Sequence, residues 1–323
     1  MRVHVVSEPK GHARTERAAS RLPFQAMRPV PGRPEPRLKG RQMTKVHVAG
    51  STGAALSLML TASAVAPRTT AGASSGAVAA SLVPGQPMVA ASGSPSLAID
   101  SGSNTSRINS TNWAGYAAAR PGTVFRYVQA TFFVPYVDCT STPNAFSSHW
   151  VGLDGLNSHT VEQLGVEAAC VGTSPQYYAW YEMYPGNESS AFSVNAGNSI
   201  IARVYYRQKA KMFVLGLNDT TTGQHFSRSL DCAAASCSRS SAQVISESPA
   251  NSTGQALPLA DYRASSFSGV SVTDSRGHRG TLSSRWWNRY QIIEVGAANN
   301  SVAGQPTSLF QGKAFDNYWF REN

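Results

Sequence analysis

The chain has 323 residues, which is long enough for one large domain or two of ordinary size. Its formal net charge of +10 would ordinarily indicate a nucleic acid or an anionic surface as partner. That charge is concentrated near the N-terminus, because residues 1–45 contain 11 of the 28 basic and 3 of the 18 acidic residues. The other 17 basic and 15 acidic residues give about +2, so we expect no nucleic-acid partner.

Residues 1–42 are rich in Arg and Pro and follow neither a helical nor a strand period, which predicts disorder. Residues 43–66 resemble a secretory signal peptide, with a basic residue at Lys45, a short apolar run and small residues before Pro67. The apolar run is too short for a stable membrane span. We therefore expect a secreted, extracellular protein that does not bind membrane once the signal is cleaved.

A signal peptide normally lies at the true N-terminus. Met43 is therefore the expected start of the protein, and residues 1–42 would be an upstream translation artefact. A genuine extended leader is the alternative.

Residues 67–106 are dominated by Ala, Ser, Gly, Thr and Pro, with too few large apolar residues to build a core, which predicts a propeptide or linker. Two motifs in this region lack their structural context. Gly72 to Gly76 matches a nucleophile elbow, but no strand precedes it. Asp100-Ser101-Gly102 resembles half of an aspartic-protease dyad, but no second copy occurs.

Residues 107–323 are expected to form a single all-β domain. Short runs of β-branched and aromatic residues alternate there with turn signals, and no apolar helical period persists for three turns. This pattern is typical of an antiparallel β-sandwich or barrel. The predicted strands are 124–133, 148–153, 176–183, 199–206, 212–217, 243–246, 266–273 and 290–295.

Four cysteines lie in this domain. An even count after a secretory leader predicts disulfides. Cys232 and Cys237 are close enough in sequence to form a local loop bond, which leaves Cys139 to pair with Cys170. Neither the cysteine spacing nor the histidine placement fits zinc, so we expect no metal and no cofactor.

The stretch from Phe146 to Pro185 is the candidate working face. It combines aromatic runs and glycines with four carboxyls in a domain that is poor in charge, and such polar groups often line a cleft. Three of them, Glu162, Glu167 and Glu182, could pair across strands and flank a glycosidic bond. The nearby His149 is in no nucleophile motif and is interpreted as structural.

Five segments in this order resemble the glutamic peptidases, the eqolisin or G1 family of secreted acid endopeptidases. They are Asn112–Tyr116 (NWAGY), Phe133–Pro135 (FVP), Trp150–Gly155 (WVGLDG), Val161–Val166 (VEQLGV) and Ala179–Pro185 (AWYEMYP). The resemblance covers roughly residues 112–272 well. It implies a sandwich of two large, bent antiparallel sheets of the concanavalin-like jelly-roll type.

The resemblance also implies a catalytic Gln and Glu. The Gln of the family motif matches Gln163, and the Glu of a later strand, Ala-Glu-Trp-Ile-Val-Glu, matches Glu247 in Ala242–Glu247 (AQVISE). This sequence departs from that motif at Gln243, Val244 and Ser246. No other carboxylate between Asp231 and Asp261 competes for the role.

These residue types suit catalysis in acid. A His side chain, with a pKa near ~6.5, is protonated at low pH and is no longer a general base, whereas a Glu near ~4.3 remains partly ionised. Glu247 is expected to take a proton from a bound water and return one to the leaving amine. Gln163 does not titrate and can donate a hydrogen bond to the oxyanion.

Other residues of the same stretch are expected to support the dyad or bind substrate. Trp150 and Asp154 match positions near it, with Asp154 orienting Gln163 or the water, and Glu182 is expected to tune the surroundings of Glu247. Trp180 and Tyr184 are candidate substrate contacts. Since strand residues alternate faces, these two should share a face with Glu182, and Tyr181 should lie on the other.

The sequence thus predicts a monomeric acid endopeptidase acting on unfolded or extended proteins and peptides. Two alternatives belong to other classes. A non-catalytic carbohydrate- or surface-binding sandwich would use the aromatic residues as a stacking platform, and a glycoside hydrolase would use paired carboxylates.

Overall fold

The computed structural model describes residues 82–83, 86–91 and 105–323, and this part of the chain contains strands and turns but no helix. The basic extension and the signal peptide predicted for residues 1–66 lie outside the described residues, as do most of residues 67–106. No helix capable of spanning a membrane occurs within the described ranges.

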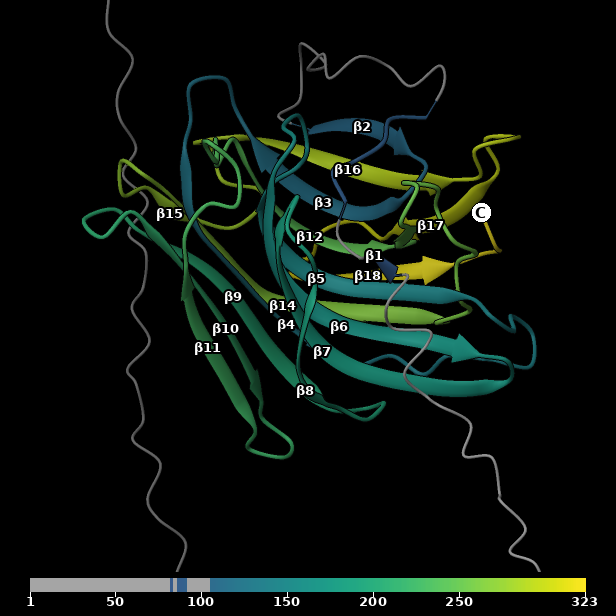
Figure 1. Cartoon of the computed structure of the whole chain (residues 1–323). Helices are drawn as coiled ribbons and strands as arrows, with labels where there is room; N and C mark the ends of the chain where they lie inside the picture. The colour runs from purple at the N-terminus through teal and green to yellow at the C-terminus, as the bar shows by residue number, and fades with distance from the viewer. Residues whose placement is uncertain (1–81, 84–85, 92–104) are drawn as a thin grey trace, which may run out of the picture. The chain divides into compact units, whose positions relative to one another are not determined.

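Eighteen strands are assigned in the described residues (Figure 1). They are β1 (Leu82–Val83), β2 (Thr105–Ser110), β3 (Trp113–Ala119), β4 (Phe125–Phe133), β5 (Phe146–Asp154), β6 (Val161–Val171), β7 (Ser174–Tyr184), β8 (Ser189–Ser193), β9 (Ser199–Arg207), β10 (Met212–Asp219), β11 (His225–Leu230), β12 (Ser241–Glu247), β13 (Ala250–Asn251), β14 (Ala264–Asp274), β15 (Arg279–Gly280), β16 (Asn288–Val295), β17 (Val302–Pro306) and β18 (Phe315–Trp319). All eight strands predicted from the sequence are present, and most extend by one to three residues at their ends.

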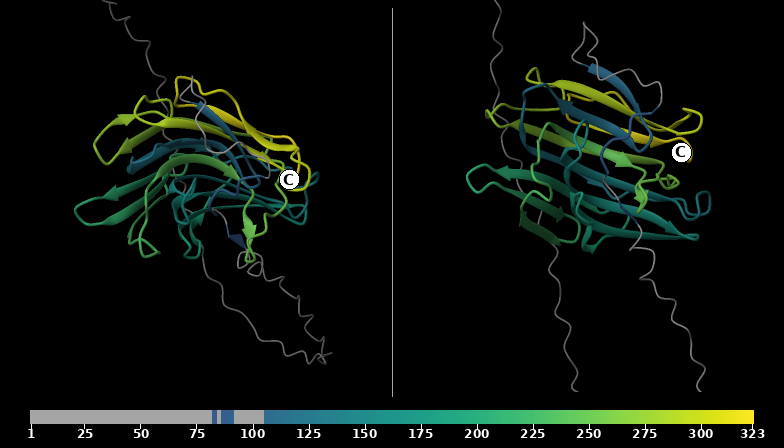
Figure 2. Two further views of the ribbon diagram at one scale, coloured as in Figure 1. Left: turned by 90° about the horizontal axis from the view of Figure 1, so that it is seen from above. Right: turned by 45° about the horizontal axis from the view of Figure 1, so that its top comes forward.

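The strands form the predicted all-β sandwich. The main hydrogen-bonded path runs β11-β10-β9-β4-β14-β18-β17-β16-β3-β12-β5-β6-β7-β8, and all neighbours on it are antiparallel. This long sheet folds over on itself, so that its strands lie in two layers when seen from above (Figure 2). Beside the path, β2 pairs with β16 in parallel, and β1 pairs with β13.

The main core lies between the two layers. Alternate residues of β4 and β9 point inward from one layer, and alternate residues of β5 and β6 point inward from the other, as period-two alternation requires. The inward set includes Phe125, Val128, Phe132, Ile200, Val204, Val151, Leu153, Leu164 and Val166, all buried. Burial of these side chains against one another is the main apolar contribution to the stability of the fold.

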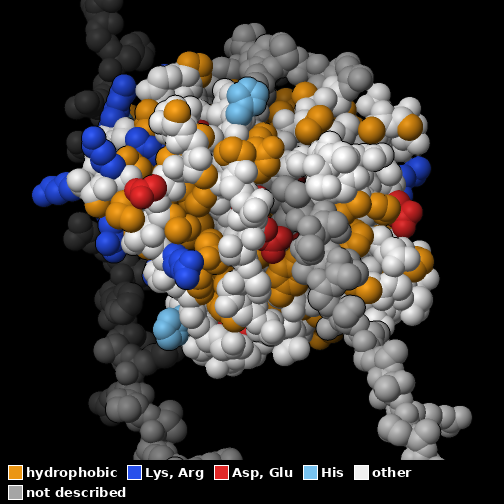
Figure 3. Space-filling view, in the orientation of Figure 1, with side chains coloured by type: hydrophobic (Ala, Val, Ile, Leu, Met, Phe, Trp, Pro, Cys, Tyr) orange, Lys and Arg blue, Asp and Glu red, His pale blue; other side chains and the backbone are white. Residues whose placement is uncertain are grey.

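The opposite face of the β3-β12-β5-β6-β7 layer is buried as well. A second apolar cluster on it contains three tryptophans, Trp113, Trp150 and Trp180. Every residue of β5 and β12 is therefore buried, whichever face it points to. Figure 3 shows one side of the molecule, on which Lys and Arg gather at the left edge and the middle carries few charged side chains.

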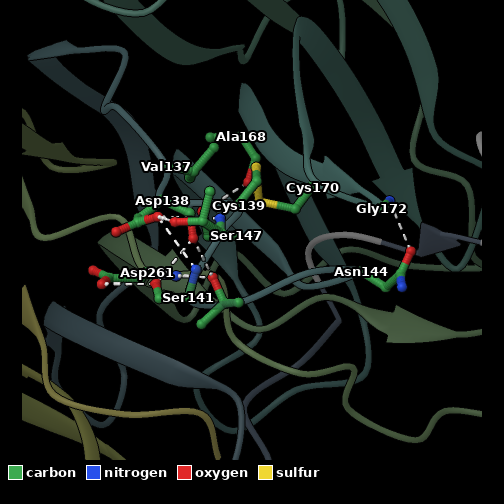
Figure 4. The surroundings of a disulfide bond; sticks show 12 residues. Val137, Asp138, Cys139, Ser141, Asn144, Ser147, Ala168, Cys170, Gly172 and Asp261 are labelled. Atoms are coloured by element: carbon green, nitrogen blue, oxygen red, sulfur yellow. Dashed lines mark hydrogen bonds between the residues drawn. A yellow bond between two sulfur atoms is a disulfide. The ribbon is translucent and has the colours of Figure 1, made fainter.

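Both predicted disulfides are confirmed. Cys139 bonds to Cys170 at the end of β6, and Cys232 bonds to Cys237 within one loop. Around the first bond, Ser147 Oγ donates to the carbonyl of Ala168 (2.9 Å), which ties β5 to β6 beside the disulfide (Figure 4). No free cysteine occurs among the described residues.

The two disulfides should differ in their contribution to stability. Cys139 and Cys170 are 31 residues apart and the other pair is 5 apart, so the loop-closure entropy removed from the unfolded chain is larger for the first. We expect the double replacement of Cys139 and Cys170 by Ala to lower the free energy of unfolding by about 4 kcal/mol, against about 2 kcal/mol for Cys232 and Cys237. Urea unfolding followed by tryptophan fluorescence measures both, and an equal loss would contradict the expectation.

Candidate active site

Three rows of paired residues cross the tryptophan-bearing face of β12, β5, β6 and β7. Directly opposed residues of antiparallel strands lie on the same face, and the next residues on that face are two positions along. The rows are Gln243-Gly152-Gln163-Glu182, Ile245-Trp150-Gly165-Trp180 and Glu247-Ser148-Glu167-Tyr178. We call these twelve residues the site face. The strand register thus places the predicted pair, Gln163 and Glu247, on one face on either side of β5.

The Glu247 carboxyl is held by three N–H donors. Trp150 Nε1 donates to Oε2 (2.8 Å), while Trp113 Nε1 and Asn112 Nδ2 donate to Oε1 (both 3.2 Å). The two indole rings pack edge to face, with centroids 5.0 Å apart, which fixes the direction of their N–H groups. An indole nitrogen can only donate, so Glu247 must accept, and such bonds favour its charged form.

Gln163 is oriented by its neighbour on β7. Its Nε2 donates to Glu182 Oε2 (2.8 Å), and both side chains are buried. An amide carries two N–H donors, so this bond uses one of them and fixes the plane of the group. Gly152 lies opposite Gln163 on β5, where an added Cβ would be 3.1 Å from Gln163 Cβ and 2.9 Å from the Trp150 ring. The absence of a side chain at Gly152 therefore makes room for both.

Buried carboxyls surround the pair. Burial, with a smaller effect from the charge of Glu188, raises the pKa of Glu182 well above its ordinary value, although the Gln163 bond opposes the shift. Burial likewise raises the pKa of Glu167, opposed by a hydrogen bond from Ser148 Oγ. Burial raises the pKa of Glu188 to about 7. In acidic solution these three groups are therefore protonated, and Glu167, whose pKa the charge of Glu247 also raises, adds no negative charge beside Glu247.

Asp154 ends β5 in the left-handed region, with a φ of 68°. Its carboxylate accepts from the backbone N–H groups of Arg239 (2.5 Å) and Ser240 (2.7 Å) and from the hydroxyls of Ser158 and Thr160. These bonds fasten the chain that leads into β12 to the end of β5. These bonds of the Asp154 carboxylate go to the residues just before β12 and to the neighbouring turn. Its expected role in orienting Gln163 therefore stays a prediction.

The aromatic residues of β7 alternate as predicted. Trp180 lies in the cluster with Trp150, and Tyr184 packs against that cluster. Tyr181 lies on the opposite face in the main core, where its ring stacks on Phe226 with centroids 4.6 Å apart. Contact of Trp180 or Tyr184 with a substrate stays a prediction.

Three residues of the site were not predicted to act there. Asn112 and Trp113 belong to the first recognised motif, but their contact with Glu247 spans more than 130 residues and depends on the β3-β12 pairing. Glu167 is expected from the sequence only as one of three carboxyls that could flank a glycosidic bond, not as a neighbour of the dyad. Strand alternation from Gln163 was the available signal, because position 167 lies four residues along on the same face.

His149 is a buried core residue. Its ring nitrogens lie 2.9 Å from Ser246 Oγ and 3.2 Å from Ser147 Oγ, and burial lowers its pKa to about 3. The side chain is therefore neutral in mildly acidic solution. No group of three or more His, Cys, Asp or Glu residues that could hold a metal ion was found in the described ranges.

Glu294 lies buried on β16, which β3 separates from β12, the strand that carries Glu247. Ser248 Oγ donates to its carboxyl, and burial raises the pKa of Glu294 to about 8. A carboxyl whose pKa is higher in the folded than in the unfolded chain stabilises the fold when protonated. That contribution is complete below the ordinary value of 4.5 and is lost as the pH rises toward 8.

We therefore expect Glu294→Gln to flatten the dependence of stability on pH. Between pH 4.5 and pH 8 the wild-type chain should lose on the order of 4 kcal/mol of unfolding free energy at this group alone. The Gln side chain does not ionise, so the variant should not lose this unfolding free energy. His149, whose lowered pKa changes stability with pH in the opposite direction, is present in both chains and does not affect the comparison. Denaturant unfolding at the two pH values gives the difference, and parallel curves for the two chains would contradict the expectation.

Comparison with known proteins identifies a family and similar solved structures. A family model described as the Peptidase A4 family matches residues 111–307. A crystal structure of scytalido-glutamic peptidase with a transition-state analogue inhibitor is similar, with a TM-score of 0.56 and 25% identity over 65% of this chain and 98% of that one. The structure of SCP-B, a member of the eqolisin family, in complex with the tripeptide Ala-Ile-His has a TM-score of 0.54 and 25% sequence identity. This match also covers 65% of this chain and 98% of that one. No curated protein sequence matches the chain.

Proposed function

The chain belongs to the peptidase A4 family of glutamic peptidases, and from this premise we propose that it is a secreted acid endopeptidase in which Glu247 and Gln163 hydrolyse peptide bonds. The observation that supports the assignment most is the set of three N–H donors on the buried Glu247 carboxyl. A carboxylate held in this way can remain charged, and so act as a base, in a solution that protonates its neighbours.

In the proposed reaction, Glu247 removes a proton from a water molecule as the water attacks the peptide carbonyl carbon. The carbonyl π electrons move to its oxygen, and an N–H of the Gln163 amide donates to the oxyanion. When the tetrahedral intermediate collapses, the C–N bond breaks and Glu247 gives its proton to the leaving amine. The carboxylate is regenerated, and the products are a carboxylic acid and an amine.

The neighbouring residues give this pair its preference for acid. Glu182 holds the Gln163 amide in one orientation through the 2.8 Å bond. Glu167, Glu182 and Glu188 have raised pKa values because they are buried. As the pH rises through about 7, Glu188 acquires a negative charge, and Glu167 and Glu182 ionise only well above the pH at which an ordinary carboxyl does. These charges would oppose the negative charge that develops on the oxyanion.

Secretion is the expected location. The segment 43–66 resembles a signal peptide, and two disulfides fit an oxidising compartment. Extended or unfolded polypeptides are the expected substrates, since an endopeptidase must bind a stretch of chain on both sides of the cleaved bond.

Removing either member of the pair should abolish hydrolysis. For the full chain incubated at acidic pH with an unfolded protein, we expect Glu247→Gln to lower kcat/KM by at least about 10³-fold and Gln163→Ala by about 10²–10³-fold. The controls Glu322→Gln and Gln208→Ala make the same chemical changes at exposed positions and should keep wild-type rates. An inert wild-type chain, or full activity in both site variants, would refute the assignment.

The indole donor to Glu247 should set the acid limit of activity. Trp150→Phe keeps the ring but removes the N–H that favours the charged carboxylate, so the acid limb of the kcat/KM profile should move up by about 1–2 pH units. Trp180→Phe is the matched control, because the Trp180 indole nitrogen makes no hydrogen bond within the described residues. Identical shifts in both variants would show that the effect comes from packing and not from the bond.

A further inference from the structure

A second polar face lies on the layer that does not carry the site face. On β14, β4 and β9 the core residues Val272, Val128 and Val204 lie directly opposite one another. Strand residues alternate faces, so the residues next to these point away from the main core. The register places them in two rows, Arg279-Thr273-Tyr127-Tyr205 and Ser271-Gln129-Arg203. We call these seven residues the outer face; it and the site face lie on opposite sides of the sandwich.

Two hollows adjoin on the outer face. The first, of about 410 Å³, is lined by Arg126, Tyr127, Tyr205, Ser271, Thr273 and Arg279. The second, of about 640 Å³, is lined by Arg126, Tyr205, Arg207, Gln208, Lys209 and Ala210. Arg126 and Tyr205 line both hollows, and no Asp or Glu is among these lining residues. A ligand that extends across both would therefore meet positive charge along its whole length.

Five cations gather at these hollows: Arg126, Arg203, Arg207, Lys209 and Arg279. Within the described part of the chain, none of their side chains has an ion pair or a hydrogen bond. The strands β4, β9 and β15 contain no acidic residue, and β14 contains one, at its last position. Lys and Arg side chains also gather at the left edge of the molecule in Figure 3, where Figure 1 draws β15. Unpaired charges of one sign attract an anionic partner.

Two of the cations lie close to the hydroxyl of Tyr127. Burial raises the pKa of Tyr127, and the charges of Arg203 and Arg279 oppose that shift. The hydroxyl donates to Gln129 Oε1 (2.8 Å), and the ring packs edge to face on Tyr205, with centroids 6.3 Å apart. The outer face thus combines guanidinium groups, an aromatic pair and small polar side chains within a few residues of one another.

We propose that the outer face binds an acidic polysaccharide, with the carboxylates of the polymer on the arginines and its sugar rings against the two tyrosines. The planar guanidinium fork matches a carboxylate and can donate two parallel hydrogen bonds to it. The hydroxyl and amide groups of Ser271, Thr273 and Gln129 can exchange hydrogen bonds with sugar hydroxyls. Tyrosine offers an apolar ring with a polar end, which suits a ligand whose rings carry both C–H and O–H groups.

The aromatic pair favours a polysaccharide over a single-stranded nucleic acid. Nucleic-acid bases stack on open aromatic faces, whereas Tyr127 and Tyr205 pack on each other and Tyr205 is only 37% exposed. Because the outer face and the site face point in opposite directions, a polymer bound to the first leaves the second uncovered. The chain would thus be retained on an acidic polymer with its site open. This inference does not depend on the proposed peptidase function.

Binding of the full chain to polygalacturonate, measured by isothermal titration calorimetry, tests the proposal. At about pH 5, where an ordinary carboxyl is ionised, we expect binding that weakens as NaCl is added, and no binding to neutral dextran. Arg126→Gln and Arg279→Gln should each lower the affinity about tenfold. Arg321→Gln is the matched control, because Arg321 is exposed and lines neither hollow, so its affinity should stay within about twofold of wild type.

Arg279 is exposed, so its replacement should leave the fold intact, and an unchanged urea midpoint by tryptophan fluorescence verifies this. Absence of binding by the wild type, or equal affinities of Arg279→Gln and Arg321→Gln, would overturn the proposal. Tighter binding of a single-stranded DNA with the same number of charges would overturn it in favour of a nucleic-acid partner. A wild-type rate of protein hydrolysis by an Arg279→Gln chain that no longer binds would support the separation of the two faces.

Discussion

The hydrogen bonds from Trp113 and Trp150 to Glu247 are the interaction on which the site depends. A carboxylate buried without donors would take up a proton and lose its basicity. Here the two indoles come from β3 and β5, the strands on either side of β12, so both pairings must be in register for the donors to meet the carboxyl. A slip of one residue would turn Glu247 toward the main core. In the proposed mechanism, the sandwich therefore acts chiefly by holding these three strands in one register.

Buried carboxyls support the proposed dependence of the site on acid. Glu167, Glu182 and Glu294 are shielded from water, and burial raises the pKa of each, so the folded chain favours their neutral forms. Their protonation stabilises the fold in acid, where many proteins are instead destabilised by protonation of paired carboxylates. The conditions that suit the fold are thus the conditions in which Glu247 would carry the main negative charge of the site. Stability and activity would decline together as the pH rises.

Much of this architecture is predictable from the sequence, and the exceptions have physical causes. Strands rich in β-branched and aromatic residues, such as β4 and β9, are recognisable, whereas β3 (WAGYAAA) and β6 (VEQLGVEAACV) are buried by their neighbours without a clear strand pattern. Gln163 and Glu247 follow from motif resemblance. The contacts of Asn112 and Trp113 with Glu247 depend on long-range pairing, which local pattern does not encode. Residues 86–91 bond to the domain through their own backbone groups, at Met88 and Val89, so their composition does not predict this attachment.

The central claim is that Gln163 and Glu247 act on one peptide carbonyl at the site face. A crystal structure of the chain with a peptide whose scissile carbonyl is replaced by a tetrahedral carbinol tests this most directly, because that group mimics the hydrated intermediate. The account predicts the carbinol oxygen within hydrogen-bond distance of both Gln163 Nε2 and the Glu247 carboxyl. A peptide bound elsewhere, or a carbinol in contact with neither side chain, would contradict it.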